Sequence, residues 1–495
     1  MSRQQERSHK TRDSVVTGLF WTFGERVTTQ IVSFVVSVVL SRLLSPSDYG
    51  IIAMVLVFIT LANTFVTSGF ATALIQKKDA DELDFSTMFY CSLACSCILY
   101  GILFLLAPFI ADFYAQPSLC LILRVFALRI PLSAFGAIQH AYVSRHLLFK
   151  RFFWSSLIGT LASGIIGVAM AMAGFGVWAL IAQYFADTIL DAIVLFITVP
   201  WRPRLLFSWS AAKPLMSYGW KVLAADLSGT FFGQLRSLIV GKFYTPADLA
   251  FYNKGQQLPQ LITQNLGSAV MGVLFPVMSN EGDDVGAVRQ ICRRCMQVMS
   301  YVTAPLLLGM AAAASDIVVL LFTEKWLECV PYLQILSLGL TIGVLGVIPL
   351  QALKAIGRSD VVLRLEFIKK PIYVLLLVVG VLKGTMAIAV TMALYELYGT
   401  AVNVLQLKRY LDYDIHTQLL DILPSFGCAL VMAAAAYFVP LPIHNVLISL
   451  VVKVVLGIAI YVGLSKLFDI ESYRYLVESA AQKLAERRGQ TQGQS

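Results

Sequence analysis

Fourteen apolar segments, each long enough to cross a membrane as a helix, occupy most of this chain of 495 residues. A helix needs about 20 apolar residues to span the hydrocarbon core of a bilayer. Only 14% of the residues are charged, against about 25% in soluble domains, and the mean hydropathy is +0.75. Since no segment alternates as barrel strands do, the sequence predicts an all-α polytopic membrane protein.

The expected spans and their grouping follow from these segments. We expect helices at residues 15–41, 49–75, 85–110, 119–143, 152–173, 176–199, 214–241, 249–276, 288–313, 329–353, 362–382, 385–407, 418–439 and 446–467. The predicted parts are a cytoplasmic N-terminus (1–14), an N-terminal six-helix bundle (15–199), a cytoplasmic linker (200–213), a C-terminal six-helix bundle (214–407), two additional transmembrane helices (418–467) and a cytoplasmic tail (468–495).

A turn that follows the first span recurs 200 residues later, after the seventh. The first turn reads Ser41-Arg42-Leu43-Leu44-Ser45-Pro46-Ser47-Asp48-Tyr49-Gly50, and the second reads Gly241-Lys242-Phe243-Tyr244-Thr245-Pro246-Ala247-Asp248-Leu249-Ala250. A proline and a capping aspartate suit a sharp junction between two helices. The repeat indicates two homologous, pseudo-symmetric bundles, an arrangement typical of secondary transporters that bind substrate between the repeats. Chance similarity of two short turns is the alternative.

Basic residues in the loops predict the orientation. With the N-terminus in the cytoplasm, the inside segments hold 25 Lys and Arg residues and the outside loops hold four, namely Arg42, Lys242, Lys325 and Lys383. This bias predicts a multi-pass protein whose N- and C-termini are both cytoplasmic. The net charge of +9 is then mostly a topology signal, and because no recognition motif accompanies it, we expect no nucleic-acid partner.

Polar side chains form a matching stripe on the first and seventh spans. In the first span they recur every three or four residues, which places them on one face: Thr22, Arg26, Gln30, Ser33, Ser37 and Ser41. At an offset of 200 the seventh span has Asp226, Thr230, Gly233, Ser237 and Gly241, with Gln234 and Arg236 beside them. Arg26 and Asp226 match in position and in depth near the midplane, so both should face a central cavity. Helix packing, or an ion pair of Arg26 with Asp226 or Glu25, is the alternative.

Amides in the second and eighth spans extend the predicted cavity. Asn63 lies in the second span, and Asn253, Lys254, Gln257, Gln260 and Gln264 lie in the eighth. Amides donate and accept hydrogen bonds and therefore suit hydroxyl-rich ligands such as sugars. Arg129 in the fourth span and Arg236 would add positive charge, with snorkelling to the interface as the alternative reading. The candidate cavity residues are Arg26, Gln30, Asn63, Arg129, Asp226, Gln234, Arg236, Asn253, Lys254, Gln257, Gln260 and Gln264.

Isolated acids inside the spans are candidates for ion coupling. Asp187 and Asp191 lie one helical turn apart, so one should hold a proton or share a cation unless an arginine such as Arg129 bridges them. Asp226 and Glu396 are the other candidates, and H⁺ and Na⁺ both remain open as the coupling ion. We expect no cofactor, no metal site and no structural disulfide, because the eight cysteines lie in or beside apolar segments without a second ligand pair.

Four short motifs, in order, resemble one known family. They are the junction Leu40-Ser41-Arg42-Leu43-Leu44-Ser45-Pro46-Ser47-Asp48-Tyr49-Gly50, then Gly69-Phe70-Ala71-Thr72-Ala73-Leu74-Ile75-Gln76-Lys77, then Leu274-Phe275-Pro276-Val277-Met278-Ser279, and Glu324-Lys325-Trp326 followed by Val330-Pro331-Tyr332-Leu333-Gln334-Ile335-Leu336. In these motifs the chain resembles the Wzx-type, WzxC-like polysaccharide flippases of the MOP (multidrug/oligosaccharidyl-lipid/polysaccharide) superfamily. The resemblance covers almost the whole chain and implies two bundles around a cleft, a MATE-like fold and a polyprenyl-pyrophosphate oligosaccharide cargo.

The resemblance implies a bacterial inner-membrane flippase that moves a lipid-linked oligosaccharide for surface polysaccharide synthesis by alternating access. Its partners would be the bilayer and, as candidates, the polymerase and glycosyltransferases of the same pathway. A multidrug or cation antiporter of the same superfamily is the alternative. Within the expected spans, however, nine basic residues beyond those assigned to the inside segments outnumber six isolated acidic residues, which suits an anionic cargo better. A membrane polymerase is disfavoured by the short outer loops, so we expect no enzyme activity.

Overall fold

The computed structural model describes residues 24, 26–77, 79–438, 445–478 and 481–482. The chain divides into two compact units, residues 1–250 and 251–495, and each is described by itself. Within the described residues, twelve helices are long and apolar enough to cross a membrane. The protein is therefore a multi-span, all-helical membrane protein, as the sequence predicts.

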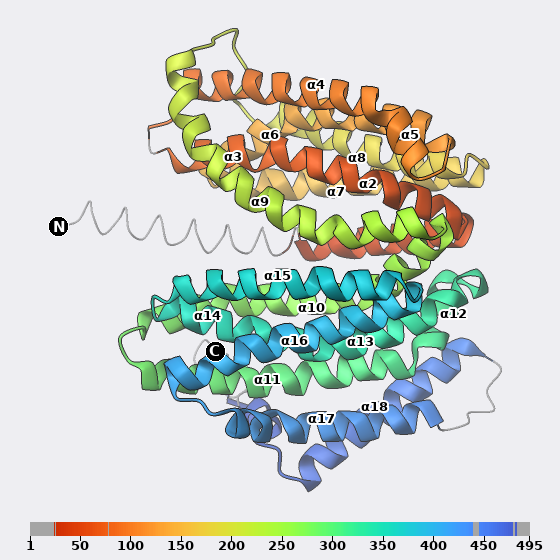
Figure 1. The fold of residues 1–495 in the computed structure, drawn as a ribbon, viewed down its shortest axis with the longest axis vertical. Coiled ribbons are helices and arrows are strands. Elements are labelled where there is room, and N and C mark those ends of the chain that lie inside the picture. The colour runs from red at the N-terminus through yellow and green to blue at the C-terminus, as the bar shows by residue number, and fades with distance from the viewer. Residues whose placement is uncertain (1–23, 25, 78, 439–444, 479–480, 483–495) are drawn as a thin grey trace, which may run out of the picture. The chain divides into compact units, whose positions relative to one another are not determined.

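The first unit begins with a helix at Arg26–Leu43. It continues with α2 (Pro46–Thr67), α3 (Gly69–Gln76), α4 (Glu82–Phe113), α5 (Ser118–Ala127), α6 (Arg129–Arg145), α7 (Phe149–Met172), α8 (Val177–Thr198) and α9 (Trp209–Phe243). The helices α7 and α8 pack along each other, and α9 packs on α2, α3 and α4 (Figure 1). The sequence assigns α9 to the C-terminal bundle, whereas its contacts here are with the first unit; the predicted bundle limits stay a prediction.

The second unit holds most of α10 (Pro246–Asn280) and then eight further α-helices. These are α11 (Val285–Ala312), α12 (Ala314–Phe322), α13 (Val330–Gly343), α14 (Val347–Ala355), α15 (Ser359–Val381), α16 (Thr385–Leu411), α17 (Ile415–Phe438) and α18 (Val446–Leu467), with 3₁₀ turns η1 (Glu324–Cys329) and η2 (Val344–Gly346). Several expected spans are broken helices: α2 with α3, α5 with α6, and η1 through α14. Each set of consecutive helices still forms one candidate membrane span, at Pro46–Gln76, Ser118–Arg145 and Glu324–Ala355.

The helices α9 and α15 differ from the other long helices in polarity. Both are long, at 35 and 23 residues, yet neither is among the twelve described helices that are apolar enough to span. Charged residues along them explain this: Lys221, Asp226 and Arg236 on α9, and Arg364, Glu366, Lys369 and Lys370 on α15. Because charge is costly against lipid, these helices are the ones whose polar faces need water, protein or a ligand.

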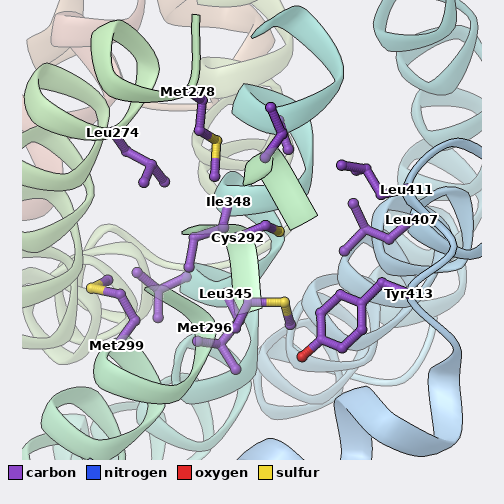
Figure 2. Close-up of a cluster of buried hydrophobic side chains, with 13 residues drawn as sticks. Leu274, Met278, Cys292, Met296, Met299, Leu345, Ile348, Leu407, Leu411 and Tyr413 are labelled. Carbon is purple, nitrogen blue, oxygen red and sulfur yellow. The ribbon is translucent and has the colours of Figure 1, made fainter. Parts of the chain in front are cut away.

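The core of the second unit is apolar and rich in methionine. Side chains from α10, α11, η2, α14 and α16 converge there (Figure 2), and Met278, Cys292 and Ile348 are fully buried. Tyr413, which follows α16, closes one side of this cluster with its ring. The cluster therefore fixes α11 and α16 against each other next to the start of α17.

A hydrogen-bonded charge network joins α11, α17 and the segment after α18. The carboxylate of Asp421 is only 5% exposed and accepts two bonds from Arg293, both of 2.8 Å, one from Tyr413 at 2.7 Å and one from Gln297 at 2.9 Å. Gln297 and Arg294 also bind Glu471, at 3.1 Å and 2.8 Å. Burial and the bond to Asp421 raise the pKa of Tyr413, so its hydroxyl stays a donor at physiological pH. The network therefore anchors the tail to the bundle.

Replacing Asp421 by alanine should destabilise the second unit by about 3 kcal/mol, because Tyr413 and Gln297 would lose an acceptor and Arg293 its counter-charge. Thermal unfolding of the purified protein in detergent measures this. The matched control is Glu82→Ala, which removes an exposed ion pair with Arg204 and should cost less than about 1 kcal/mol. Equal midpoints for the two variants would show that the network contributes little.

Candidate functional site: polar faces within each unit

The repeated turns adopt the same capped structure. Ser45 and Asp48 form a reciprocal capping box at the start of α2, with bonds of 3.0, 2.6 and 3.2 Å. Thr245 and Asp248 form the same three bonds, at 3.0, 2.6 and 3.2 Å, at the start of α10. The sequence repeat is therefore also a repeat of local structure, and the descent of the two halves from one ancestor stays a prediction.

The two turns also touch each other in the first unit. A Cβ at Gly50 would overlap the backbone carbonyl group of Pro246, so only glycine fits at position 50. Gly241, which matches Ser41 in the repeat, is packed as closely: a Cβ there would lie 3.0 Å from the ring of Tyr114 and 3.1 Å from Met54. These contacts hold the first helix, α2 and the end of α9 together at one end of the unit.

The predicted stripe of the first unit contains exposed charges. Arg26 and Gln30 are exposed on the first helix, and Asp226 is exposed on α9. Neither Arg26 nor Asp226 forms an ion pair with any residue that the structure describes, so the expected alternative of an Arg26–Asp226 pair is not observed; Glu25 lies outside the described residues. Gln234 and Arg236 are half-buried on α9. Charges without a protein partner are available to a ligand.

Other polar residues of the first unit hold helices together. The hydroxyl of Ser133 on α6 donates to Asn63 on α2 at 3.1 Å, and Thr64 on α2 donates to Thr230 on α9 at 3.3 Å. For this part of the stripe the packing alternative therefore describes what the side chains do. The amide nitrogen of Asn63 remains free of these bonds and could still serve a ligand.

The acids of α8 have neighbours that the sequence does not reveal. Asp191 pairs with His140 of α6, at 2.7 Å between Nε2 and Oδ2. Arg129 donates to Thr188 at 2.6 Å, and its guanidinium lies over the ring of Tyr184, 5.1 Å from the centroid. Arg129 is the basic group that acts electrostatically on the half-buried Asp187, but it forms no direct bridge to it. Arg129 thus belongs to this α6–α8 cluster.

The predicted amide row on α10 lies in the second unit. Asn253, Gln257 and Gln260 are half-buried and Gln264 is exposed. In the described part of the chain, the side chains of Asn253, Gln260 and Gln264 form no hydrogen bond. An amide at membrane depth without such a bond needs water or a polar ligand, so Asn253, Gln260 and Gln264 are candidate sugar-binding residues.

Lys254 differs from its neighbours on α10. It is 4% exposed, and its ammonium lies 4.5 Å from the ring centroid of Phe322 and 5.4 Å from that of Trp326. Trp326 belongs to one of the four family motifs and is fully buried, with Phe251 edge-on at 6.0 Å. The rings stabilise the ammonium by cation–π attraction, so in this structure Lys254 acts as a packing residue of the unit. Its assignment to the cavity stays a prediction.

Glu396 lies in a second group of ionisable residues, on α15 and α16. It packs on Gly343 of α13, where any side chain would overlap its carboxylate. Nearby, Glu366 and the buried Lys369 form an ion pair at 2.6 Å, and the rings of Tyr373 and Tyr395 meet at 5.1 Å. The role of Glu396 in ion coupling is untested by this geometry. Among the described residues, no group of three or more His, Cys, Asp or Glu could hold a metal ion.

Solved structures share this fold. The lipid II flippase MurJ in an inward closed conformation matches with a TM-score of 0.74 and 14% identity, over 93% of this chain and 100% of that one. An inward-facing multidrug resistance MATE transporter of the MOP superfamily matches with a TM-score of 0.59 and 12% identity, over 78% and 94%. The chain therefore shares the helical fold of these two structures.

Sequence comparisons give the family. A model described as "Polysaccharide biosynthesis protein" matches residues 39–331, more than half of the chain. The succinoglycan biosynthesis transport protein ExoT of Rhizobium meliloti is 25% identical over 66% of this chain, which spans 66% of that relative's length. The lipopolysaccharide biosynthesis protein WzxC of Escherichia coli is 24% identical over 80% of each chain. The chain belongs to the polysaccharide biosynthesis protein family.

Proposed function

We propose that this protein is a flippase that moves a polyprenyl-pyrophosphate-linked oligosaccharide from the cytoplasmic to the outer leaflet of a bacterial inner membrane. The observation that carries the proposal is the set of polar groups in both units, at membrane depth, that have no partner among the residues the structure describes. Arg26 is exposed in the first unit and forms no ion pair with a described residue, and the side-chain amides of Gln260 and Gln264 in the second unit form no hydrogen bond within the described part of the chain. A cation suits the pyrophosphate, and amides suit the sugars.

The transport cycle would be alternating access between the two units. The repeated turn and the similarity to MurJ and to a MATE transporter support this mechanism. Arg26 would neutralise the pyrophosphate while the amide row of α10 holds the glycan, and the polyprenyl chain would remain in the bilayer at a lateral opening. The protein's own residues bind and release the cargo without forming or breaking a covalent bond, so the chain acts as a transporter and not as an enzyme.

Relatives named for succinoglycan and lipopolysaccharide synthesis support a surface polysaccharide as the end product. Glycosyltransferases would make the cargo on the cytoplasmic side, and a polymerase would consume it outside. These enzymes would therefore be the partners of this protein. The loop charges support an orientation with both termini in the cytoplasm. The antiporter alternative has the MATE-like fold in its favour, but exposed Arg26 is unsuited to a cationic drug.

Deletion of the gene in its native host, followed by complementation, tests the proposal. We expect the deletion to remove a surface polysaccharide and the wild-type chain to restore it, because a glycan that stays on the inner leaflet cannot be polymerised outside. The same strains are tested for survival in cationic dyes as a control. Unchanged surface polysaccharide together with raised dye sensitivity would contradict the proposal and favour the antiporter.

A further inference from the structure

A compact ionisable cluster lies between α6, α7 and α8, apart from the exposed stripe of Arg26 and Asp226. His140 Nε2 lies 2.7 Å from Asp191 Oδ2, and the imidazole stacks on Phe152 of α7, with ring centroids 5.1 Å apart at 18°. Asp187 lies one turn from Asp191 on α8. Glycines on α6 and α7 leave room for the two carboxylates. A Cβ at Gly136 would lie 3.7 Å from the Asp191 carboxylate, and a Cβ at Gly159 would lie 3.6 Å from the Asp187 carboxylate.

We propose that His140 and Asp191 form the proton-binding site that couples transport to protons, with Asp187 setting its charge balance. The inference rests on the proposed function, because coupling requires a transport cycle. It differs from the sequence expectation, in which Asp187 and Asp191 share an ion or bridge to Arg129. The carboxylate of Asp191 holds the imidazole of His140 through Nε2. The imidazole is the group that would accept the proton.

The charges of the cluster explain why a proton would matter. With Asp187 and Asp191 both ionised, the two carboxylates contribute two negative charges, and Arg129, which donates to Thr188, contributes one positive charge. With a neutral His140 the cluster has a net charge of about −1, and with a protonated His140 it is neutral. A net charge is costly to enclose in a membrane, so a conformation that shields the cluster from water should favour the protonated form. Protonation would then bias the equilibrium between inward- and outward-open states.

Charged groups on the neighbouring helices are occupied elsewhere. Arg145 of α6 binds the backbone carbonyls of Leu74, at 2.8 Å, and Lys77. Lys77 itself pairs with Asp84 of α4 at 2.6 Å, and Arg151 of α7 binds the carbonyl of Thr198. On α2, which also packs on α6 and α8, Asp48 is committed to the capping box and Tyr49 lies near Tyr184. Lys150 of α7 lies beyond the cluster, toward the start of that helix.

The cluster lies at a depth that protons can reach. His140 is five residues from the end of α6 and Asp191 is seven from the end of α8, which corresponds to about 8 and 10 Å at 1.5 Å per residue. Both ends are predicted to be cytoplasmic, and the His140 side chain is 41% exposed. A sodium ion would prefer oxygen ligands alone, whereas the Asp191 carboxylate here already faces an imidazole nitrogen, so we commit to the proton.

The test follows the conformational equilibrium of the full-length protein in lipid nanodiscs without any cargo. Genetically encoded spin labels replace Phe175 and Leu382, which are exposed at the predicted outer ends of the two units, and distances between them are measured at about pH 8 and about pH 5.5. We expect the ratio of the distance populations to change about tenfold in the wild type. His140→Gln and Asp191→Asn should abolish this change. The matched control His146→Gln, at the end of α6, should keep it.

A further variant separates coupling from a structural bridge. His140→Lys keeps a positive partner for Asp191, but the lysine stays charged between about pH 5.5 and about pH 8. This variant should therefore show the low-pH distribution of spin-label distances at both pH values. It should also fail to export glycan in the host. If His140→Lys exports normally, or if His140→Gln keeps the wild-type response to pH, the inference is overturned. A response to Na⁺ in place of K⁺, at constant pH, overturns it as well.

The two proposals fail separately in these experiments. A pH response that depends on His140, in a protein whose deletion leaves surface polysaccharide unchanged, would support the proton site and contradict the flippase. Loss of surface polysaccharide on deletion, with no pH response in the wild-type protein, would support the flippase and contradict the proton site.

Discussion

Replacing Gly50 by alanine should leave almost no folded protein in the membrane. The added methyl group would occupy the position of the Pro246 carbonyl, where neither backbone can move without separating the two repeated turns. Overpacking of this kind costs about 3 kcal/mol or more when the obstacle is backbone. Detergent extraction followed by fluorescence-detected size exclusion measures the amount of monodisperse protein.

The control for this substitution is Gly101→Ala. Gly101 lies in α4 with no atom within 4 Å of its missing Cβ, so alanine should be neutral or slightly stabilising there. Position 250, the repeat equivalent of Gly50, already carries a methyl group in buried Ala250, so the two turns are not interchangeable. Monodisperse Gly50→Ala protein at the level of Gly101→Ala would show that the turns do not need this contact.

Removing the charge of Arg26 should lower glycan export at least about tenfold, because a charge-assisted contact to phosphate is worth roughly 1.5–3 kcal/mol. Arg26→Lys should retain more export than Arg26→Ala, because the lysine keeps the charge and loses only the planar geometry. Both variants should insert, since Arg26 is exposed and pairs with no described residue. Surface polysaccharide per unit of membrane-inserted protein is the measurement.

Arg124 provides a matched control in the same unit. It donates to the carbonyl of Phe104 at 3.3 Å and lies over the Phe104 ring at 4.4 Å, near the predicted outer end of α5. Arg124→Ala removes the same charge from a side chain that already has partners, and export should stay close to the wild-type level. Equal export by the wild type and Arg26→Ala, at equal membrane abundance, would mean that Arg26 has only a packing role.

Hydropathy and the repeated turn predict much of the fold. Length and apolar content locate the spans, and the Ser-Pro-x-Asp and Thr-Pro-x-Asp turns locate two capped helix starts that the structure confirms. The helix breaks at Ser68 and Leu128 could not be predicted. Hydropathy indicates that a segment is long enough to cross the bilayer, but it does not indicate where the helix axis bends within that segment. The tail network around Asp421 also escapes prediction, since Arg293 and Asp421 are 128 residues apart in the sequence.

Side-chain placement was predictable only within one helix. Spacing of three or four correctly indicates that Asp187 and Asp191 share a turn, but not that His140 of α6 faces Asp191, which depends on how α6 and α8 pack. Depth alone was a weak signal, because His140 and Asp191 lie three and eight residues from the predicted cytoplasmic ends of their spans, 119–143 and 176–199. The spacing on α10 likewise does not reveal that the ammonium of Lys254 lies over the rings of Phe322 and Trp326, and its place in the cavity stays a prediction.

The most direct test of the central claim measures the leaflet in which lipid-linked oligosaccharide resides. Spheroplasts of the native host are labelled in the glycan and treated with a membrane-impermeant glycosidase, with the gene present, deleted, or replaced by Arg26→Ala. A flippase predicts that the wild-type cells expose the labelled glycan, whereas cells without the gene accumulate it in a protected form and the variant resembles the deletion. The same accessible fraction in wild-type and deleted cells would contradict the account.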